Sequence, residues 1–135
     1  MKNKITDTLD MKVLLSTLWI FVLFNMIFLD IHAFLKPGFI AEIMTGTVNG
    51  TLMTQQLLLM GAIMVEIPIV MVLLSRILKY KIKRLANIIA PVIIMIGILA
   101  NLSTDPDNIF VGTIMVIALL SIFRYAWKWP KPLEQ

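Results

Sequence analysis

Apolar residues run along this chain in four long blocks, separated by short polar connections. The blocks cover residues 11–35, 51–78, 85–102 and 109–127. A stretch of about 20 apolar residues is the length at which an α-helix crosses the hydrocarbon core of a bilayer. A bilayer offers the backbone no hydrogen-bond partners, and each block is too long for a strand, so each is predicted to be a helix. The pattern therefore predicts an all-α fold, a polytopic four-helix transmembrane bundle in which residues 1–135 form a single transmembrane domain.

The basic residues gather at one side of this predicted bundle. They precede the first block, surround the second connection and follow the fourth block: Lys2, Lys4, Lys12, Arg76, Lys79, Lys81, Lys83, Arg84, Arg124, Lys128 and Lys131. Only Lys36 lies on the other side, together with the acidic Glu42, Asp105 and Asp107. Cytoplasmic connections of membrane proteins carry an excess of Lys and Arg. The distribution predicts that the N and C termini are both cytoplasmic.

The composition is typical of a membrane protein and limits the kinds of partner that the chain is expected to bind. Hydrophobic residues make up 59% of the chain and charged residues 15%, against roughly 45–50% and 25% in soluble domains. The net charge is +4, but the cations lie at the ends of apolar blocks, where they act first as topology signals. Nucleic acid is therefore not a predicted partner; the expected partners are the lipid bilayer and either a second copy or another membrane protein. The chain has no cysteine, which excludes disulfides and thiolate metal sites.

Two polar residues fall near the middle of their blocks. Asn25 lies 14 residues after Met11, and Glu66 lies 12 residues before Leu78, so at about 1.5 Å per residue both are expected near the midplane. If the first two helices pack as a hairpin, a protonated Glu66 can donate a hydrogen bond to Asn25. An ionisable residue inside a membrane is by default a candidate for function, as a proton or cation carrier; the structural alternative is an interhelical hydrogen bond. Pro68, two residues later, is predicted to kink the helix because it lacks a backbone N–H.

A second polar layer is predicted on the side opposite the cations, and it contains Asp30, His32, Gln55, Gln56 and Asn101. For Asp30 and His32 the alternatives are a metal or proton site and ordinary interfacial groups near the headgroups. One histidine with one carboxylate is a weak ligand set, so no metal site is predicted. The candidates for ligand or proton binding are therefore Glu66, Asn25, Asp30, His32, Gln55 and Asn101.

Small and polar residues recur on one face of the third block. Asn87, Ala90, Ile94, Gly97 and Asn101 follow one another at spacings of 3, 4, 3 and 4. Small residues allow membrane helices to approach closely, so this face is predicted to be a helix-packing seam. The fourth block shows no comparable pattern and is predicted to face lipid more than the others.

Short motifs in the first three blocks resemble a family of short, four-span prokaryotic membrane proteins that is described as a domain of unknown function. The motifs are an N-x-x-x-x-D, an E-I-P, and an S-R-x-L followed by an R-x-A-N, formed by Asn25, Asp30, Glu66, Pro68, Ser75, Arg76, Arg84 and Asn87. The resemblance implies a multi-pass protein of a prokaryotic cytoplasmic membrane. It implies no activity, cofactor or catalytic residue.

Three classes of function follow from these observations. The favoured class is a small oligomeric transport protein, or one that binds a small ligand or ion, with Glu66 inside the membrane. The alternative is a structural or accessory subunit that packs through the seam of the third block. An enzyme that binds a lipid or quinone is the least favoured, because the sequence offers no nucleophile–base arrangement and no metal cluster; no catalytic residue and no cofactor are predicted.

Overall fold

The computed structural model describes residues 4–101 and 103–130, and this part of the chain is almost entirely helical. Four of its helices are long and apolar enough to cross a membrane, which confirms the predicted all-α, four-helix architecture. In chain order the elements are α1 (Lys4–Ala33), α2 (Phe39–Met44), β1 (Thr47–Val48), β2 (Thr51–Leu52), α3 (Gln55–Ile77), α4 (Tyr80–Ala100) and α5 (Pro106–Lys128).

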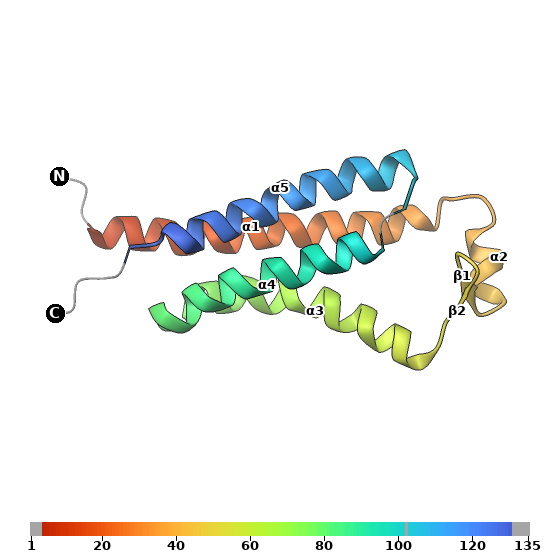
Figure 1. The fold of residues 1–135 in the computed structure, drawn as a ribbon, viewed down its shortest axis with the longest axis horizontal. Coiled ribbons are helices and arrows are strands. Elements are labelled where there is room, and N and C mark those ends of the chain that lie inside the picture. Colours follow the sequence, from red (N-terminus) through yellow and green to blue (C-terminus); the bar gives the residue numbers. More distant parts are fainter. Residues whose placement is uncertain (1–3, 102, 131–135) are drawn as a thin grey trace.

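The four long helices form a bundle in which α1 and α4 each pack against both α3 and α5 (Figure 1). The start of α1, the turn between α3 and α4 and the end of α5 lie at one end of the bundle, here called the basic end. The opposite end, here called the α2 end, carries α2, the two short strands and the turn between α4 and α5. The hydrophobic core lies toward the basic end, where Leu15, Trp19, Val22 and Ile122 are fully or almost fully buried.

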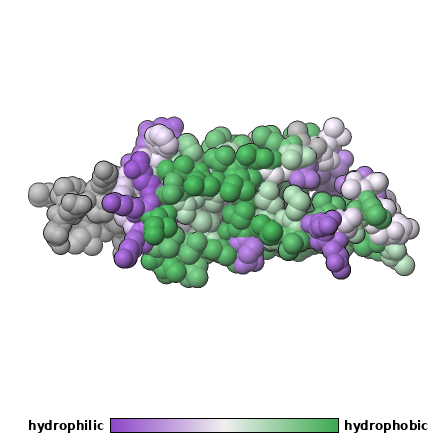
Figure 2. Space-filling view, turned by 60° about the horizontal axis from the view of Figure 1, so that its bottom comes forward, coloured by the Kyte–Doolittle hydropathy of each residue, from purple (hydrophilic) through white to green (hydrophobic). Residues whose placement is uncertain are grey.

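Hydrophobic side chains cover the outside of the bundle between its two ends. Figure 2 shows this as a hydrophobic band with hydrophilic residues on both sides. Exposed leucines and isoleucines such as Leu59, Leu73 and Ile96 contribute to it. A soluble protein rarely exposes so large an apolar surface, and lipid tails cover such a surface without cost. The band therefore supports the description of the chain as a membrane protein.

The first connection contains more structure than the sequence analysis expected. After α2, Thr47 and Val48 pair with Thr51 and Leu52 in a small antiparallel hairpin. Asn49 and Gly50 turn the chain with φ values of 50° and 72°, the left-handed backbone that a two-residue hairpin turn requires and that an Asn-Gly pair adopts readily. Beyond the hairpin, the Thr54 hydroxyl caps α3 by accepting a hydrogen bond from the Leu57 amide at 3.2 Å.

The basic segment that follows α3 is helical, whereas the third block was expected to begin at residue 85. α4 begins at Tyr80, so Lys83 belongs to a helix and is only 2% exposed. Tyr80, Lys83 and Asn87 are spaced by three and four residues, which places them on one helical face. Because four of the six residues at 79–84 are basic, this segment was interpreted as a polar connection and its helical periodicity was not recognised.

The prediction that the fourth block faces lipid more than the others is wrong. α5 buries the largest share of its residues among the four long helices, and α3 the smallest. Its buried residues recur every three or four positions: Val111, Gly112, Met115, Ala118, Leu119, Ile122 and Ala126. Because nearly every residue of α5 is apolar, the packed face does not stand out from the lipid-facing one in the sequence.

Candidate ligand-binding cavity

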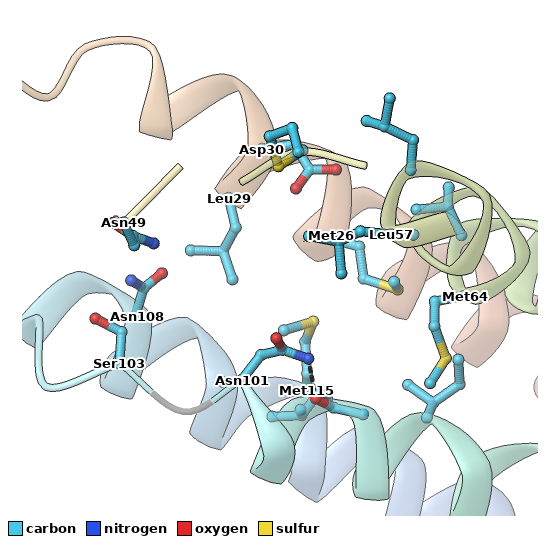
Figure 3. A pocket seen from close by; sticks show the side chains of 18 residues that line it. Met26, Leu29, Asp30, Asn49, Leu57, Met64, Asn101, Ser103, Asn108 and Met115 are labelled. Atoms are coloured by element: carbon cyan, nitrogen blue, oxygen red, sulfur yellow. Dashed lines mark hydrogen bonds between the residues drawn. The ribbon is translucent and has the colours of Figure 1, made fainter. Parts of the chain in front are cut away.

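A cavity of about 560 Å³ lies between the four long helices in the half of the bundle near the α2 end. Its deeper wall is apolar and includes Met26 of α1, Met64 of α3, Ile94 of α4 and Met115 of α5. Polar side chains join the lining toward the α2 end, beside the apolar Met53, Leu57 and Leu58, and Figure 3 shows how they lie around the space. These polar lining residues are Asp30, Asn49, Asn101, Ser103 and Asn108. The cavity thus has an apolar floor and a polar rim.

The cavity exists because α3 and α4 diverge toward the α2 end (Figure 1). At its floor the Met64 side chain lies directly on α4, since a Cβ atom at Gly97 would lie 2.6 Å from the Cε atom of Met64. The absence of a side chain at Gly97 leaves room for the flexible end of Met64 in this position. Pro68, one turn further along α3, is fully buried, and it leaves the carbonyl of Met64 without its helical donor, a condition under which helices bend.

The polar rim is held in place by the turn between α4 and α5. The Asn101 side-chain amide donates to the Gly97 carbonyl at 2.9 Å, which fixes its orientation at the end of α4. The Ser103 hydroxyl accepts from the Asp105 amide at 3.2 Å, and the Asn108 amide donates to the Asp105 carboxylate at 3.4 Å. Each amide side chain keeps further hydrogen-bonding capacity that a bound molecule can use.

An ion cluster ties the end of α1 to the start of α5 beside the rim. The Lys36 ammonium lies 2.5 Å from the Asp105 carboxylate and 3.3 Å from that of Asp107, and His32 Nε2 lies 3.4 Å from Asp107. The hydrogen bond between Lys36 and Asp105 raises the pKa of Lys36 and lowers the pKa of Asp105. Both groups are therefore charged at neutral pH, and the pair holds the α1–α5 side of the cavity together. Within the described residues, no group of three histidines and carboxylates is arranged to hold a metal ion.

Glu66 and Asn25 do not form the pair that the sequence suggested. The Asn25 amide donates to the Phe21 carbonyl of its own helix at 2.8 Å, and among the described residues no hydrogen bond reaches the Glu66 carboxyl. Pro68, which is buried, lies two positions after Glu66 and so about 200° around the helix. Glu66 therefore lies on the exposed face of α3, as do Gln55 and Ala62, and outside the cavity.

The residues that the sequence suggested for ligand or proton binding therefore do not form one site. Asp30 and Asn101 line the cavity, and His32 belongs to the ion cluster. Gln55 lies exposed in the first turn of α3. In the seam of α4, Asn87, Ala90 and Ile94 are buried, and Gly97 is at the cavity floor.

A buried polar network near the basic end was not anticipated. The Trp19 indole N–H donates to the Asn87 side-chain oxygen at 2.7 Å, and the Ser75 hydroxyl donates to the same oxygen at 3.1 Å. The Asn87 amide donates in turn to the Lys83 carbonyl at 2.9 Å. One asparagine thereby joins α1, α3 and α4, and no side chain in this network is exposed. The sequence signal was the spacing of Lys83 and Asn87, which shows a shared face but not the partners from the other helices.

Two further sets of contacts close the basic end around this network. The Ser16 hydroxyl donates to the Val72 carbonyl and accepts from the Arg76 guanidinium, both at 3.0 Å. Arg84 donates to the carbonyls of Ala126 and Trp127 at 3.2 and 2.9 Å. Both carbonyls lie in the last turn of α5, where a cation is stabilised by the negative end of the helix dipole.

Comparison with known proteins adds one match. The model of a family of unknown function, DUF6326, matches residues 4–129. No curated protein and no solved structure matches the chain. The matched segment contains every residue that lines the cavity and every residue of the buried network.

Proposed function

Because the chain belongs to DUF6326, whose function is unknown, we propose a role from its geometry: it is an integral membrane protein that binds a small amphipathic molecule. The cavity near the α2 end is the binding site. The observation that carries this proposal is a partly open cavity of about 560 Å³ shared by all four long helices.

The lining of the cavity matches the two parts of an amphipathic ligand. Pockets for small molecules are typically several hundred Å³ in volume, mostly apolar, with a few convergent polar groups. Methionine side chains are flexible and polarisable, so Met26, Met64 and Met115 can adapt to apolar groups of different shape. Closer to the α2 end, the side-chain amides of Asn101 and Asn108 can form hydrogen bonds with the polar head group of the ligand.

Transport would require a second opening in addition to this binding site. The cavity lies toward the α2 end, whereas Asn87 joins three helices near the basic end. A transport cycle would have to break that network in every turnover. Binding alone needs no such step, and for this reason we prefer a binding protein to a carrier.

A binding experiment with a neutral probe tests the proposal. We expect protein in phosphatidylcholine nanodiscs to bind radiolabelled decyldimethylamine oxide saturably, at one site per chain, after subtraction of the signal from empty nanodiscs. The decyl chain suits the apolar floor, and the amine oxide suits the polar rim. Binding that rises linearly with probe concentration, as partition into lipid does, would contradict the proposal.

Two phenylalanine substitutions on adjacent residues provide the matched control. Gly61 lines the cavity, and a Cβ atom added there meets nothing within 4 Å. Gly61→Phe is therefore expected to place its ring in the space and to reduce the affinity at least about tenfold, which is a loss of about 1.4 kcal/mol of binding free energy. Ala62 is exposed and does not line the cavity, so Ala62→Phe is expected to leave the affinity unchanged. Equal affinities in the two variants would locate the probe elsewhere.

For the orientation we propose that the basic end faces the cytoplasm of a prokaryotic cell, with the protein in the cytoplasmic membrane. The support is the concentration of Lys and Arg at that end. Because the chain has no cysteine, a single engineered cysteine is the only target of a thiol reagent. An impermeant maleimide is expected to label a Met44→Cys variant in intact cells, but a Lys81→Cys variant only after lysis. The reverse pattern would invert the orientation.

One observation favours a second role, lateral association with another membrane chain. Glu66 lies near the middle of α3, on a face that is otherwise mostly apolar and exposed. A carboxyl in contact with lipid is costly, and a hydrogen-bonding partner on a second chain would reduce that cost. A second copy is the simplest such partner, because two Glu66 carboxyls related by a twofold axis can pair with each other.

A further inference from the structure

We infer that the cavity selects cationic amphipathic molecules, with the carboxylate of Asp30 as the counter-ion of a ligand ammonium group. This inference rests on the proposed binding function and adds the chemical class of the ligand.

Asp30 is the only ionisable side chain among the described residues that line the cavity. Among the described residues it forms no ion pair and no side-chain hydrogen bond, in contrast to His32 of α1 and Lys36 in the connection that follows, which contact Asp107 and Asp105. Figure 3 shows its carboxylate on the wall of the cavity, opposite Asn101 and Met115. The rim therefore carries one carboxyl group that forms no ion pair with any described side chain.

The surroundings of the cavity strengthen the preference for a cation. The described residues at the α2 end include one lysine and four carboxylates, namely Lys36, Asp30, Glu42, Asp105 and Asp107. Lys36 is already engaged by Asp105 and Asp107, so its charge is not available to attract an anion. A surface with an excess of one sign raises the local concentration of the opposite ion.

The other lining groups suit an alkylammonium head. Asn49, Asn101 and Asn108 offer carbonyl oxygens, whose partial negative charge faces a cation favourably. An alkylated ammonium is large and weakly hydrated, and it needs no directed hydrogen bond. The polarisable sulfurs of Met26 and Met53 provide a soft wall for its methyl groups.

Three probes with the same tail and different heads test the inference. They are decyltrimethylammonium, the neutral decyldimethylamine oxide and decyl sulfate, each measured in phosphatidylcholine nanodiscs at pH 8 with empty nanodiscs as reference. We expect the cation to bind about fivefold more tightly than the neutral probe and the anion about fivefold more weakly, the size of effect that a partly exposed ion pair gives. At 1 M salt these differences should shrink because the charges are screened.

Asp30→Asn separates this inference from the proposal on which it rests. The variant keeps the shape of the side chain and removes its charge, so it should lose the preference for the cation: the ratio between the affinities for the cationic and the neutral probe should fall to about one. Glu42→Gln, which removes a more distant charge at the same end outside the cavity, should retain most of the preference. Saturable binding of the neutral probe with equal affinity for all three heads would overturn the inference alone. Failure of the neutral probe to bind would overturn the proposed function as well.

Discussion

Replacement of Asn87 by leucine is expected to lower the free energy of unfolding by about 2–3 kcal/mol, because it leaves two buried donors without an acceptor. The Trp19 indole N–H and the Ser75 hydroxyl both donate to the Asn87 oxygen. Leucine has the same branched shape and number of side-chain heavy atoms, so the substitution leaves no empty space and the loss reports on the hydrogen bonds. Unfolding in bicelles, followed by steric trapping or by titration with a denaturing detergent, measures this difference.

Asn101 provides a matched control for this substitution. Its amide donates to the carbonyl four residues earlier, as that of Asn87 does, but Asn101 is exposed and accepts no hydrogen bond from another helix among the described residues. Asn101→Leu is expected to change the stability by less than about 1 kcal/mol, as surface substitutions usually do. Equal losses in the two variants would mean that Asn87 does not join the helices.

Replacement of Glu66 by leucine is expected to lower the association constant between copies about five- to thirtyfold, while the monomer stays folded. A hydrogen bond between membrane helices contributes roughly 1–2 kcal/mol, and the leucine variant loses it. The exposed position of Glu66 on α3 means that no contact within the monomer is lost. Single-molecule photobleaching in liposomes over a range of protein-to-lipid ratios gives the constant.

Glu66→Gln is the control, because an amide can pair with its symmetry-related copy as a protonated carboxyl does. The glutamine variant is expected to associate nearly as well as the unmodified chain. If the leucine variant associates as strongly as the glutamine variant, Glu66 has no part in an interface, and the second proposed role is wrong.

The sequence predicted the helical architecture because length and hydropathy are enough to identify a membrane-spanning helix. The seam of α4 stays a prediction from the spacing of small and polar residues; of that face, Asn87, Ala90 and Ile94 are buried and Asn101 is exposed. The Asn49–Gly50 hairpin was missed although its turn residues carried a signal. α5 was misjudged for a different reason: helices that are apolar on all sides reveal no packed face, and only the neighbouring helices decide which side is buried.

The candidate site was harder to predict because it depends on the directions in which helices present their side chains. Asp30 and Asn101 were recognised as polar residues of one layer, but their meeting around a cavity follows from the divergence of α3. The sequence was enough to place Glu66 near the middle of its helix. It did not show toward which neighbour the Glu66 side chain points, because the rotation of α3 about its axis is fixed by the buried Pro68, Met71 and Ser75 on the opposite face. The methionines of the floor come from three helices and share no pattern in the sequence.

The measurement that tests the central claim most directly is magnetisation transfer from the probe to methyl-labelled methionine. With the protein in nanodiscs and decyldimethylamine oxide at saturation, we expect transfer from the decyl chain to the methyl groups of Met26, Met64 and Met115, which line the cavity. Met44 on α2 and Met71 in the core lie outside it and should receive none. Transfer only to the exposed Met60 of α3, as from probe dissolved in the surrounding lipid, would show that the cavity does not bind the molecule.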